Sequence, residues 1–188
     1  KIVGVLALQG AFESHKKVLN ELDVVSLEVR TPQDLAQVDA LIMPGGESTT
    51  MSQLLESSDL YEPIKKLIYE GMPVFGTCAG MILLAKKIID GRDDQISFGA
   101  IEIEVQRNAY GRQVDSFEAD VEVEGLVPAF HAVFIRAPKI LQAGKDVEVL
   151  ASFGSDVVLA RQKNVLVASF HPELSQDGRI HELFVKEI

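Results

Sequence analysis

The residue best suited to chemistry in this chain is its one cysteine, Cys78, which lies at the centre of Gly76-Thr77-Cys78-Ala79-Gly80. An apolar, strand-like run precedes this segment, and a helical pattern over residues 81–89 follows it. Glycines two positions on either side of a nucleophile are typical of the sharp strand-to-helix turn called a nucleophile elbow. Small neighbours are needed there because the strand and the helix approach closely. The spacing therefore predicts that the Cys78 thiol is presented as a nucleophile above the sheet edge.

Two backbone features of such a turn would help a thiol react. The N-terminus of the following helix favours the thiolate, which is the nucleophilic form. The backbone N–H of Ala79 is suitably placed to stabilise an oxyanion. The alternative is that Cys78 is a small buried core residue, which is the commonest fate of a free cysteine. The flanking glycines favour the elbow.

A base for this thiol is predicted near the other end of the chain, where an apolar run over residues 165–170 leads into His171-Pro172-Glu173. Polar groups at the end of a strand lie where open α/β sheets bind ligands. Pro172 restricts His171 to extended backbone, in which residues 171 and 173 point to the same side. Glu173 can then fix the tautomer of His171 while His171 takes the thiol proton.

Taken alone, His171 would be interpreted as an ordinary histidine. The other three histidines, His15, His131 and His181, lie in less suggestive contexts. We expect structural or solvated roles for them.

A glycine-rich loop, Pro44-Gly45-Gly46-Glu47-Ser48-Thr49-Thr50, follows a third apolar run. Two glycines permit backbone geometries in which N–H groups face a ligand, as in an anion-binding nest. The loop lacks the Gly-Lys-Ser/Thr ending of a nucleotide-binding loop. The alternative is that Ser48 or Thr49 is a plain helix N-cap.

The elements that must position these groups alternate in type through the first half of the chain. Short β-branched runs near 2–8, 24–29, 38–43 and 73–76 are separated by helical patterns, which is typical of a parallel sheet covered on both faces. The second half has closely spaced strand signals, which predict an antiparallel extension of the sheet. These signals lie near residues 100–106, 117–124, 131–136, 147–152, 156–161 and 165–170, and a helix is expected within 176–188. The expected class is a flavodoxin-like, three-layer α/β sandwich.

Composition limits the classes of function. The 188 residues, 47% of them hydrophobic, are enough for one core, so we expect residues 1–188 to form one domain. A net charge of −10 opposes nucleic-acid binding. One cysteine can form neither an intramolecular disulfide nor a cysteine-based zinc site, which favours a reducing, cytoplasmic setting and no metal. The apolar run at residues 2–8 is too short to span a bilayer, so no membrane partner is expected.

Six motifs resemble the glutaminase subunits of pyridoxal 5'-phosphate synthase, within the triad (class I) glutamine amidotransferases. The cysteine and histidine motifs define the wider class, and the Gly-Glu-Ser-Thr, Arg-Asn and Ile-Arg-Ala-Pro segments narrow the resemblance to this subunit. They are Leu8-Gln9-Gly10-Ala11, Pro44 to Thr50, Gly76 to Gly80, Arg107-Asn108-Ala109-Tyr110-Gly111-Arg112-Gln113, Phe134-Ile135-Arg136-Ala137-Pro138 and Ser169-Phe170-His171-Pro172-Glu173-Leu174.

The resemblance implies a set of substrate contacts. Gly46, Glu47 and Ser48 would line an L-glutamine site, and Gly46 would join Ala79 in the oxyanion hole. Arg107 and the pair Ile135 and Arg136 would help to hold the substrate, and an arginine fork suits a free carboxylate. The alternative for Arg107, Arg112 and Arg136 is a surface ion pair, which we prefer for Arg112.

The activity so implied is a glutaminase that uses Cys78, His171 and Glu173 without cofactor or metal. Its ammonia would pass to a separate synthase subunit in a large hetero-oligomer that makes pyridoxal 5'-phosphate (vitamin B6). We expect weak activity from the subunit alone, because the Gly45–Gly46 peptide can flip and disassemble the oxyanion hole. One alternative is a glutaminase that serves another synthase, for example in histidine biosynthesis. Another is a non-catalytic binding or redox-sensing module, which His171 and Glu173 disfavour.

Overall fold

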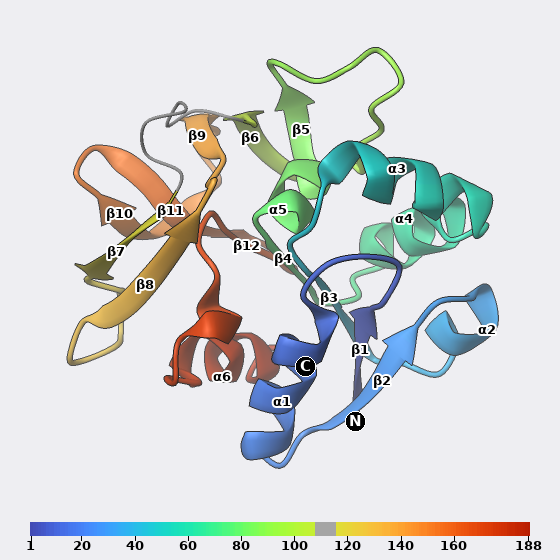
Figure 1. The fold of residues 1–188 in the computed structure, drawn as a ribbon, viewed down its shortest axis with the longest axis horizontal. Helices are drawn as coiled ribbons and strands as arrows, with labels where there is room; N and C mark the ends of the chain where they lie inside the picture. Colours follow the sequence, from blue (N-terminus) through green and yellow to red (C-terminus); the bar gives the residue numbers. More distant parts are fainter. Residues whose placement is uncertain (108–115) are drawn as a thin grey trace.

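Short buried strands alternate with amphipathic helices in the computed structural model, which describes residues 1–107 and 116–188 (Figure 1). The elements run in the order β1 (Ile2–Leu6), α1 (Phe12–Glu21), β2 (Val25–Val29), α2 (Pro32–Leu35), β3 (Ala40–Met43), α3 (Ser48–Ser57), α4 (Tyr61–Tyr69), β4 (Val74–Thr77), α5 (Ala79–Leu84), β5 (Ala85–Ile88), β6 (Ile101–Gln106), β7 (Ser116–Val121), β8 (Phe130–Ile135), β9 (Lys139–Ala143), β10 (Glu148–Phe153), β11 (Asp156–Gln162), β12 (Val165–Ala168), the 3₁₀ turn η1 (Pro172–Leu174) and α6 (Arg179–Val185). None of the helices in these described ranges is long and apolar enough to cross a membrane.

The main sheet has the strand order β10-β11-β12-β4-β3-β1-β2. The five strands from β12 to β2 are parallel to their neighbours, whereas β11 and β10 run antiparallel at one edge. The predicted flavodoxin-like class is confirmed. The predicted antiparallel extension is only partly right, because β10 and β11 alone extend this sheet. Strands β5, β6 and β9 form a second sheet, and β7 pairs with β8 in a third.

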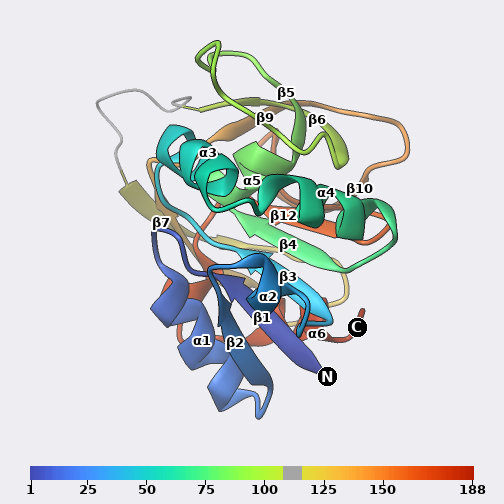
Figure 2. The same ribbon diagram turned by 90° about the vertical axis from the view of Figure 1, so that its right-hand side faces the viewer.

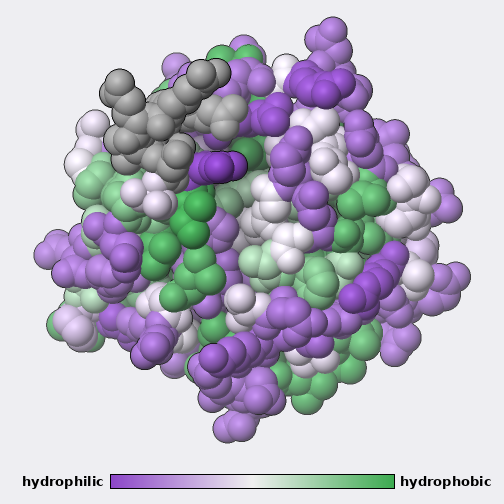
Figure 3. All heavy atoms as spheres, viewed as in Figure 1, coloured by the Kyte–Doolittle hydropathy of each residue, from purple (hydrophilic) through white to green (hydrophobic). Residues whose placement is uncertain are grey.

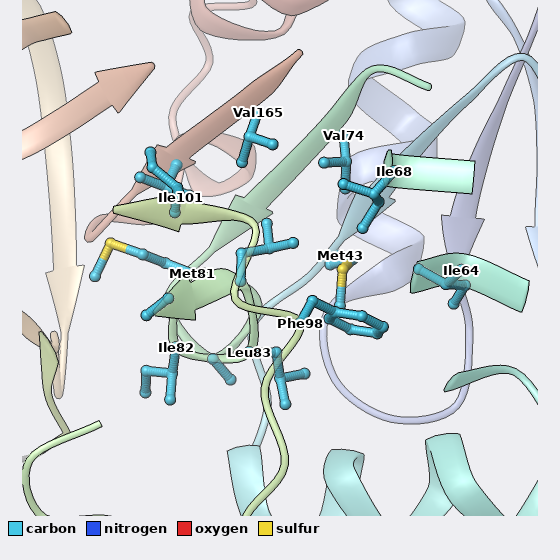
Figure 4. Packing of buried hydrophobic residues seen from close by; sticks show 14 of the residues in the cluster. Met43, Ile64, Ile68, Val74, Met81, Ile82, Leu83, Phe98, Ile101 and Val165 are labelled. Atoms are coloured by element: carbon cyan, nitrogen blue, oxygen red, sulfur yellow. The ribbon is translucent and has the colours of Figure 1, made fainter. Parts of the chain in front are cut away.

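Side chains alternate between two apolar clusters, one on each face of the main sheet. Along β3, Leu41 and Met43 pack in the cluster that includes α3, α4 and α5, whereas Ala40 and Ile42 pack in the cluster that includes α1 and α6. This is the period of two that a strand buried on both faces requires. Figure 2 shows α3, α4 and α5 on one side of the sheet and α1 on the other. In Figure 4, residues of α5 such as Met81 and Leu83 point into the first cluster together with Met43 and Phe98.

The helix predicted over residues 81–89 is wrong in its second half. Helix α5 ends at Leu84, and residues 85–88 form β5, which pairs with β6. The cause lies far along the chain, because Phe98 N–H and Ala100 N–H donate to the carbonyls of Leu83 and Leu84 at 2.7 and 2.8 Å. Those carbonyls would bond to the next turn in a continuing helix. Strand β9 and the short helix α2 were not predicted.

The three candidate motifs emerge at one edge of the main sheet. Strand β4 lies between β3 and β12, and all three run in the same direction. The glycine loop follows β3, Cys78 follows β4, and His171 follows β12 at a short distance. Polar and charged residues cover most of the face drawn in Figure 3, and apolar residues form separate groups between them.

The contact of α5 with β3 makes a testable prediction about stability. An added Cβ at Gly80 would lie 2.0 Å from the carbonyl oxygen of Met43, which is backbone and cannot move aside. Gly80→Ala should therefore lower the free energy of unfolding in urea by about 2 kcal/mol or more. Gly178→Ala is the control, because its nearest atom is the mobile end of Leu22 at 3.3 Å. Equal urea midpoints for the two variants would contradict the proposed close packing.

Candidate active site

Cys78 occupies a backbone conformation that L-residues rarely adopt. Its φ is 52° and its ψ is −108°, directly between β4 and α5. Such a conformation costs on the order of 1–3 kcal/mol and persists only where the surroundings impose it. Here Cys78 N–H donates to Ala168 O at 2.9 Å, and Cys78 O accepts from Ile82 N–H at 3.1 Å. The strand-to-helix turn predicted from the sequence is present.

The two glycines that flank this turn lie against each other. An added Cβ at Gly76 would lie 2.7 Å from Gly80 O, and one at Gly80 would strike Met43. Close approach of strand and helix is therefore the reason for both glycines.

His171 and Glu173 are joined directly. His171 Nδ1 lies 2.8 Å from Glu173 Oε2, and the Glu173 side chain is fully buried. The backbone N–H of His171 donates to Val133 O at 2.8 Å, which ties the segment to β8. The expectation that extended backbone points His171 and Glu173 to the same side is wrong, because residues 172–174 form a 3₁₀ turn. The turn brings the carboxylate to Nδ1 of the His171 ring, so the other ring nitrogen, Nε2, is left for the pocket.

Gly45 lies against both the thiol and the imidazole. An added Cβ there would lie 2.8 Å from His171 Cε1 and 3.5 Å from Cys78 Cβ. The loop is held from outside, because Ala11 N–H donates to Gly45 O at 3.2 Å and Glu47 N–H donates to Gln9 Oε1 at 2.8 Å. The N-terminal motif at residues 8–11 thus fixes the orientation of the Gly45–Gly46 peptide.

The N-cap of α3 is Glu47, so the alternative that Ser48 or Thr49 caps this helix is wrong. The Glu47 carboxylate accepts from the backbone N–H groups of Thr49 and Thr50. The hydroxyls of Ser48 and Thr49 lie 3.4 and 3.2 Å from Gln95 Oε1, to which they donate. Gln95 was not singled out from the sequence, and it anchors the start of α3 to the loop before β6.

A pocket of about 410 Å³ collects nearly all of the predicted residues. This volume is within the range of small-molecule sites. Its lining comprises Gly46, Glu47, Ser48, Cys78, Ala79, Ile82, Arg107, Ile135, Arg136, Pro138 and His171. Glu173 lies behind His171. Ile82 and Pro138 are the two residues of this lining to which the sequence analysis assigned no role.

The predicted alternative of a surface ion pair finds no support at two of the three arginines. Within residues 1–107 and 116–188, no carboxylate oxygen pairs with Arg107 or Arg136. Both side chains line the pocket instead. Arg112 and the rest of its motif from residue 108 lie outside the described residues.

The electrostatics of the thiol differ from the prediction. Burial raises the pKa of Cys78 well above its ordinary value, and the negative charge of Glu173 raises it further. Cys78 is 6% exposed, and its Sγ donates to Ser169 O at 3.2 Å. Burial and Glu173 therefore oppose the thiolate that the helix N-terminus was expected to favour.

Two histidines expected to be structural or solvated lie directly behind the Glu173 carboxylate. His15 and His181 are fully buried, and His15 Nδ1 lies 2.8 Å from His181 Nε2. His15 Nε2 lies 3.7 Å from Glu173 Oε1. Their burial could have been predicted, because His15 shares a helical stripe with Val18 and Leu19, and His181 is next to Ile180 on an apolar face. Their contact with Glu173 has no local signal.

Comparisons with known proteins agree with this arrangement. Residues 5–188 match the SNO glutamine amidotransferase family. The chain is 54% identical to pyridoxal 5'-phosphate synthase subunit PdxT of Thermosipho africanus, over 99% of this chain and 98% of that protein. It is 56% identical to the subunit of the same name in Herpetosiphon aurantiacus, with 97% and 98% covered. A solved structure described as a glutamine amidotransferase superposes with a TM-score of 0.94 at 49% identity, over 100% of this chain and 98% of that one.

The influence of Glu173 on the thiol can be measured by alkylation. Glu173→Gln removes a charge that raises the pKa of Cys78, so iodoacetamide at about pH 8 should modify Cys78 roughly threefold faster than in the wild type. The control is Glu182→Gln, which removes an exposed carboxylate from α6. Equal rates in both variants would contradict the assigned electrostatic effect.

The buried histidines make stability depend on pH. Burial lowers the pKa of His181 to about 4, whereas an unfolded histidine titrates near about 6.5. The unfolded chain therefore binds a proton that the folded chain refuses, and stability that is present above about pH 6.5 falls as the pH drops towards 4. His181→Leu should reduce the loss of unfolding free energy between about pH 7.5 and 5 by roughly 2 kcal/mol.

The matched control is His131→Leu. The exposed His131 has a pKa raised by hydrogen bonds to Asp120 and Glu118, so its removal acts in the opposite direction. Unfolding in urea at the two pH values measures both variants. An unchanged loss in His181→Leu would refute the assignment.

Proposed function

The chain belongs to the SNO glutamine amidotransferase family, and from this premise we propose that it hydrolyses L-glutamine to L-glutamate and ammonia. Cys78 is the nucleophile, His171 the base and Glu173 the group that orients the base. The observation that carries the proposal is the single pocket in which the strained Cys78 turn faces His171 and the glycine loop. The whole chain acts as one glutaminase domain.

The first chemical step moves a proton. The buried thiol is neutral, and His171 Nδ1 is bonded to Glu173, so the thiol proton passes to His171 Nε2. The sulfur then attacks the side-chain amide carbon of glutamine. The resulting oxyanion is stabilised by the backbone N–H groups of Ala79 and Gly46. The carbon–nitrogen bond breaks as His171 returns the proton to the departing amine, and ammonia leaves.

The second step regenerates the thiol. A water molecule loses its proton to His171 and attacks the glutamyl thioester, and the sulfur leaves with the proton that His171 holds. The products are L-glutamate and the original thiol. No metal or cofactor takes part.

Substrate binding rests on the two pocket arginines. Arg107 and Arg136 pair with no carboxylate among the described residues, so each guanidinium is available for the α-carboxylate of glutamine. The Glu47 side chain is engaged as the cap of α3, so its contribution to the substrate is through the backbone. Ser48 and Ile135 complete the wall of the pocket.

Ammonia is delivered to a synthase subunit for pyridoxal 5'-phosphate biosynthesis in the cytoplasm. This partner is supported by relatives at 54 and 56% identity that are named as subunits of that synthase. The same names weigh against a synthase of histidine biosynthesis. A redox-sensing role is disfavoured, because a sensor needs an accessible thiol of low pKa, and burial raises the pKa of Cys78.

The free subunit is expected to be weakly active. The thiol donates to Ser169 O, and the Gly45–Gly46 peptide is held by Ala11 N–H. A flip of this peptide would break the bond that Ala11 N–H donates to Gly45 O. Docking of the synthase would select the arrangement in which the oxyanion hole is complete.

Glutamate release with and without the matching synthase subunit tests the proposal. Wild type should be active chiefly in the complex, and Cys78→Ala should lower its turnover by about 10³-fold or more because the nucleophile is lost. His131→Gln, at an exposed site on β8, is the control that should retain turnover. Absence of wild-type activity with a folded synthase, or full activity without it, would contradict the proposal.

A further inference from the structure

A line of buried polar groups continues from the catalytic pair into the protein interior. Glu173 Oε2 bonds to His171, whereas Glu173 Oε1 is buried and has no hydrogen-bond partner among residues 1–107 and 116–188. His15 Nε2 lies 3.7 Å from this free oxygen, and His181 Nε2 lies 2.8 Å from His15 Nδ1. The three groups come from η1, α1 and α6, and α1 lies beside α6 in Figure 1.

The direction of the hydrogen bonds follows from what each atom can do. If His15 donated to His181, then His15 would turn a lone pair towards a carboxylate, and His181 Nδ1 would be a buried N–H without an acceptor. If His181 Nε2–H donates to His15 Nδ1, then His15 Nε2–H points to Glu173, and His181 Nδ1 is left as an unpaired acceptor. Orphaned buried N–H groups are rarer than orphaned acceptors. The second arrangement is therefore preferred.

We propose that His15, oriented by His181, is a positioning residue of the triad that directs its Nε2–H at the free oxygen of Glu173, 3.7 Å away, and so holds this carboxylate towards His171. The inference rests on the proposed glutaminase function. It assigns a role to two histidines that touch neither the substrate pocket nor the thiol.

The neutrality of the donor is essential to this role. Burial lowers the pKa of His15 well below its ordinary value, and His181 and His171 lower it further. A cation at position 15 would compete with the imidazolium of His171 for the carboxylate. Within the described residues, the groups that face His15 are Glu173 from η1, His181 from α6, His171 beyond the carboxylate and the Thr77 hydroxyl from β4, which lies 3.4 Å from Nε2.

Loss of the donor has a definite consequence for the pH profile. A carboxylate without it is a stronger base, so the His171–Glu173 pair gives up its proton at higher pH. The active form, neutral His171 beside ionised Glu173, is then reached only at higher pH. The acid limb of the kcat/KM profile should move to higher pH, whereas KM for glutamine should not change, because His15 lies outside the pocket.

The experiment compares His15→Leu with His15→Gln in the complex with the synthase subunit. A glutamine places an amide N–H close to the position of the imidazole Nε2–H, whereas leucine offers no donor. Leucine should move the acid limb up by about one pH unit and lower kcat about tenfold, and glutamine should restore the wild-type limb. His181→Phe, which leaves His15 without its own donor, should move the limb less and in the same direction.

Two outcomes would overturn the inference. A wild-type limb in both His15→Leu and His181→Phe, even with lowered stability, would reduce the histidines to packing residues and overturn it. An equal upward shift in His15→Gln and His15→Leu would also overturn it, because the donor would then be irrelevant.

If His15→Leu does not fold, His181→Phe and an NMR titration of His171 in the free subunit give the same test. An inactive wild-type complex would refute the proposed function and not this inference, since the NMR titration of His171 does not depend on turnover.

Discussion

The turn at Cys78 is the constraint around which the rest of the site is arranged. Its backbone has a φ of 52°, and both of its ends are fixed, because its N–H donates to β12 and its carbonyl accepts from α5. A residue in such a conformation is held only where its neighbours leave no alternative. The neighbours are glycines at 76 and 80, whose missing side chains let β4, α5 and β3 approach one another. The position of the sulfur is thus set by the packing of three buried elements.

Sheet topology supplies the second half of the site. Strand β12 pairs with β4 in parallel, so Ala168 lies opposite Thr77 although the chain between them includes two smaller sheets. Because parallel strands end at the same edge, the residues that follow β4 and β12 meet there. Gly45, which follows β3 on the other side of β4, fills the space between them. The sheet therefore positions most of the catalytic groups, and the 3₁₀ turn at residues 172–174 adds Glu173.

Sequence reasoning succeeded where a residue's position depends on a strand end or a motif, and failed where it depends on distant contacts. Cys78, His171, Arg107 and Arg136 were predicted from such signals, and they line one pocket. The end of α5 at Leu84 was not predicted, because acceptors of its last turn bond to Phe98 and Ala100. The rise in the pKa of the thiol was not predicted, for a similar reason. A helix N-terminus is visible in the sequence, whereas the burial of Cys78 beside Glu173 is a product of the whole fold.

Charge explains why a neutral thiol is compatible with nucleophilic chemistry here. Glu173 raises the pKa of the thiol and so opposes a resting thiolate, and the same carboxylate lies 2.8 Å from Nδ1 of the ring that takes the thiol proton in the proposed mechanism. In the proposed mechanism, transfer creates a row of charges with the imidazolium between two anions, which is the arrangement that Coulomb attraction favours. A further buried cation would weaken that row. The two histidines behind Glu173 add no such cation, because burial lowers the pKa of each. The neutral N–H of His15 can still point to the carboxylate.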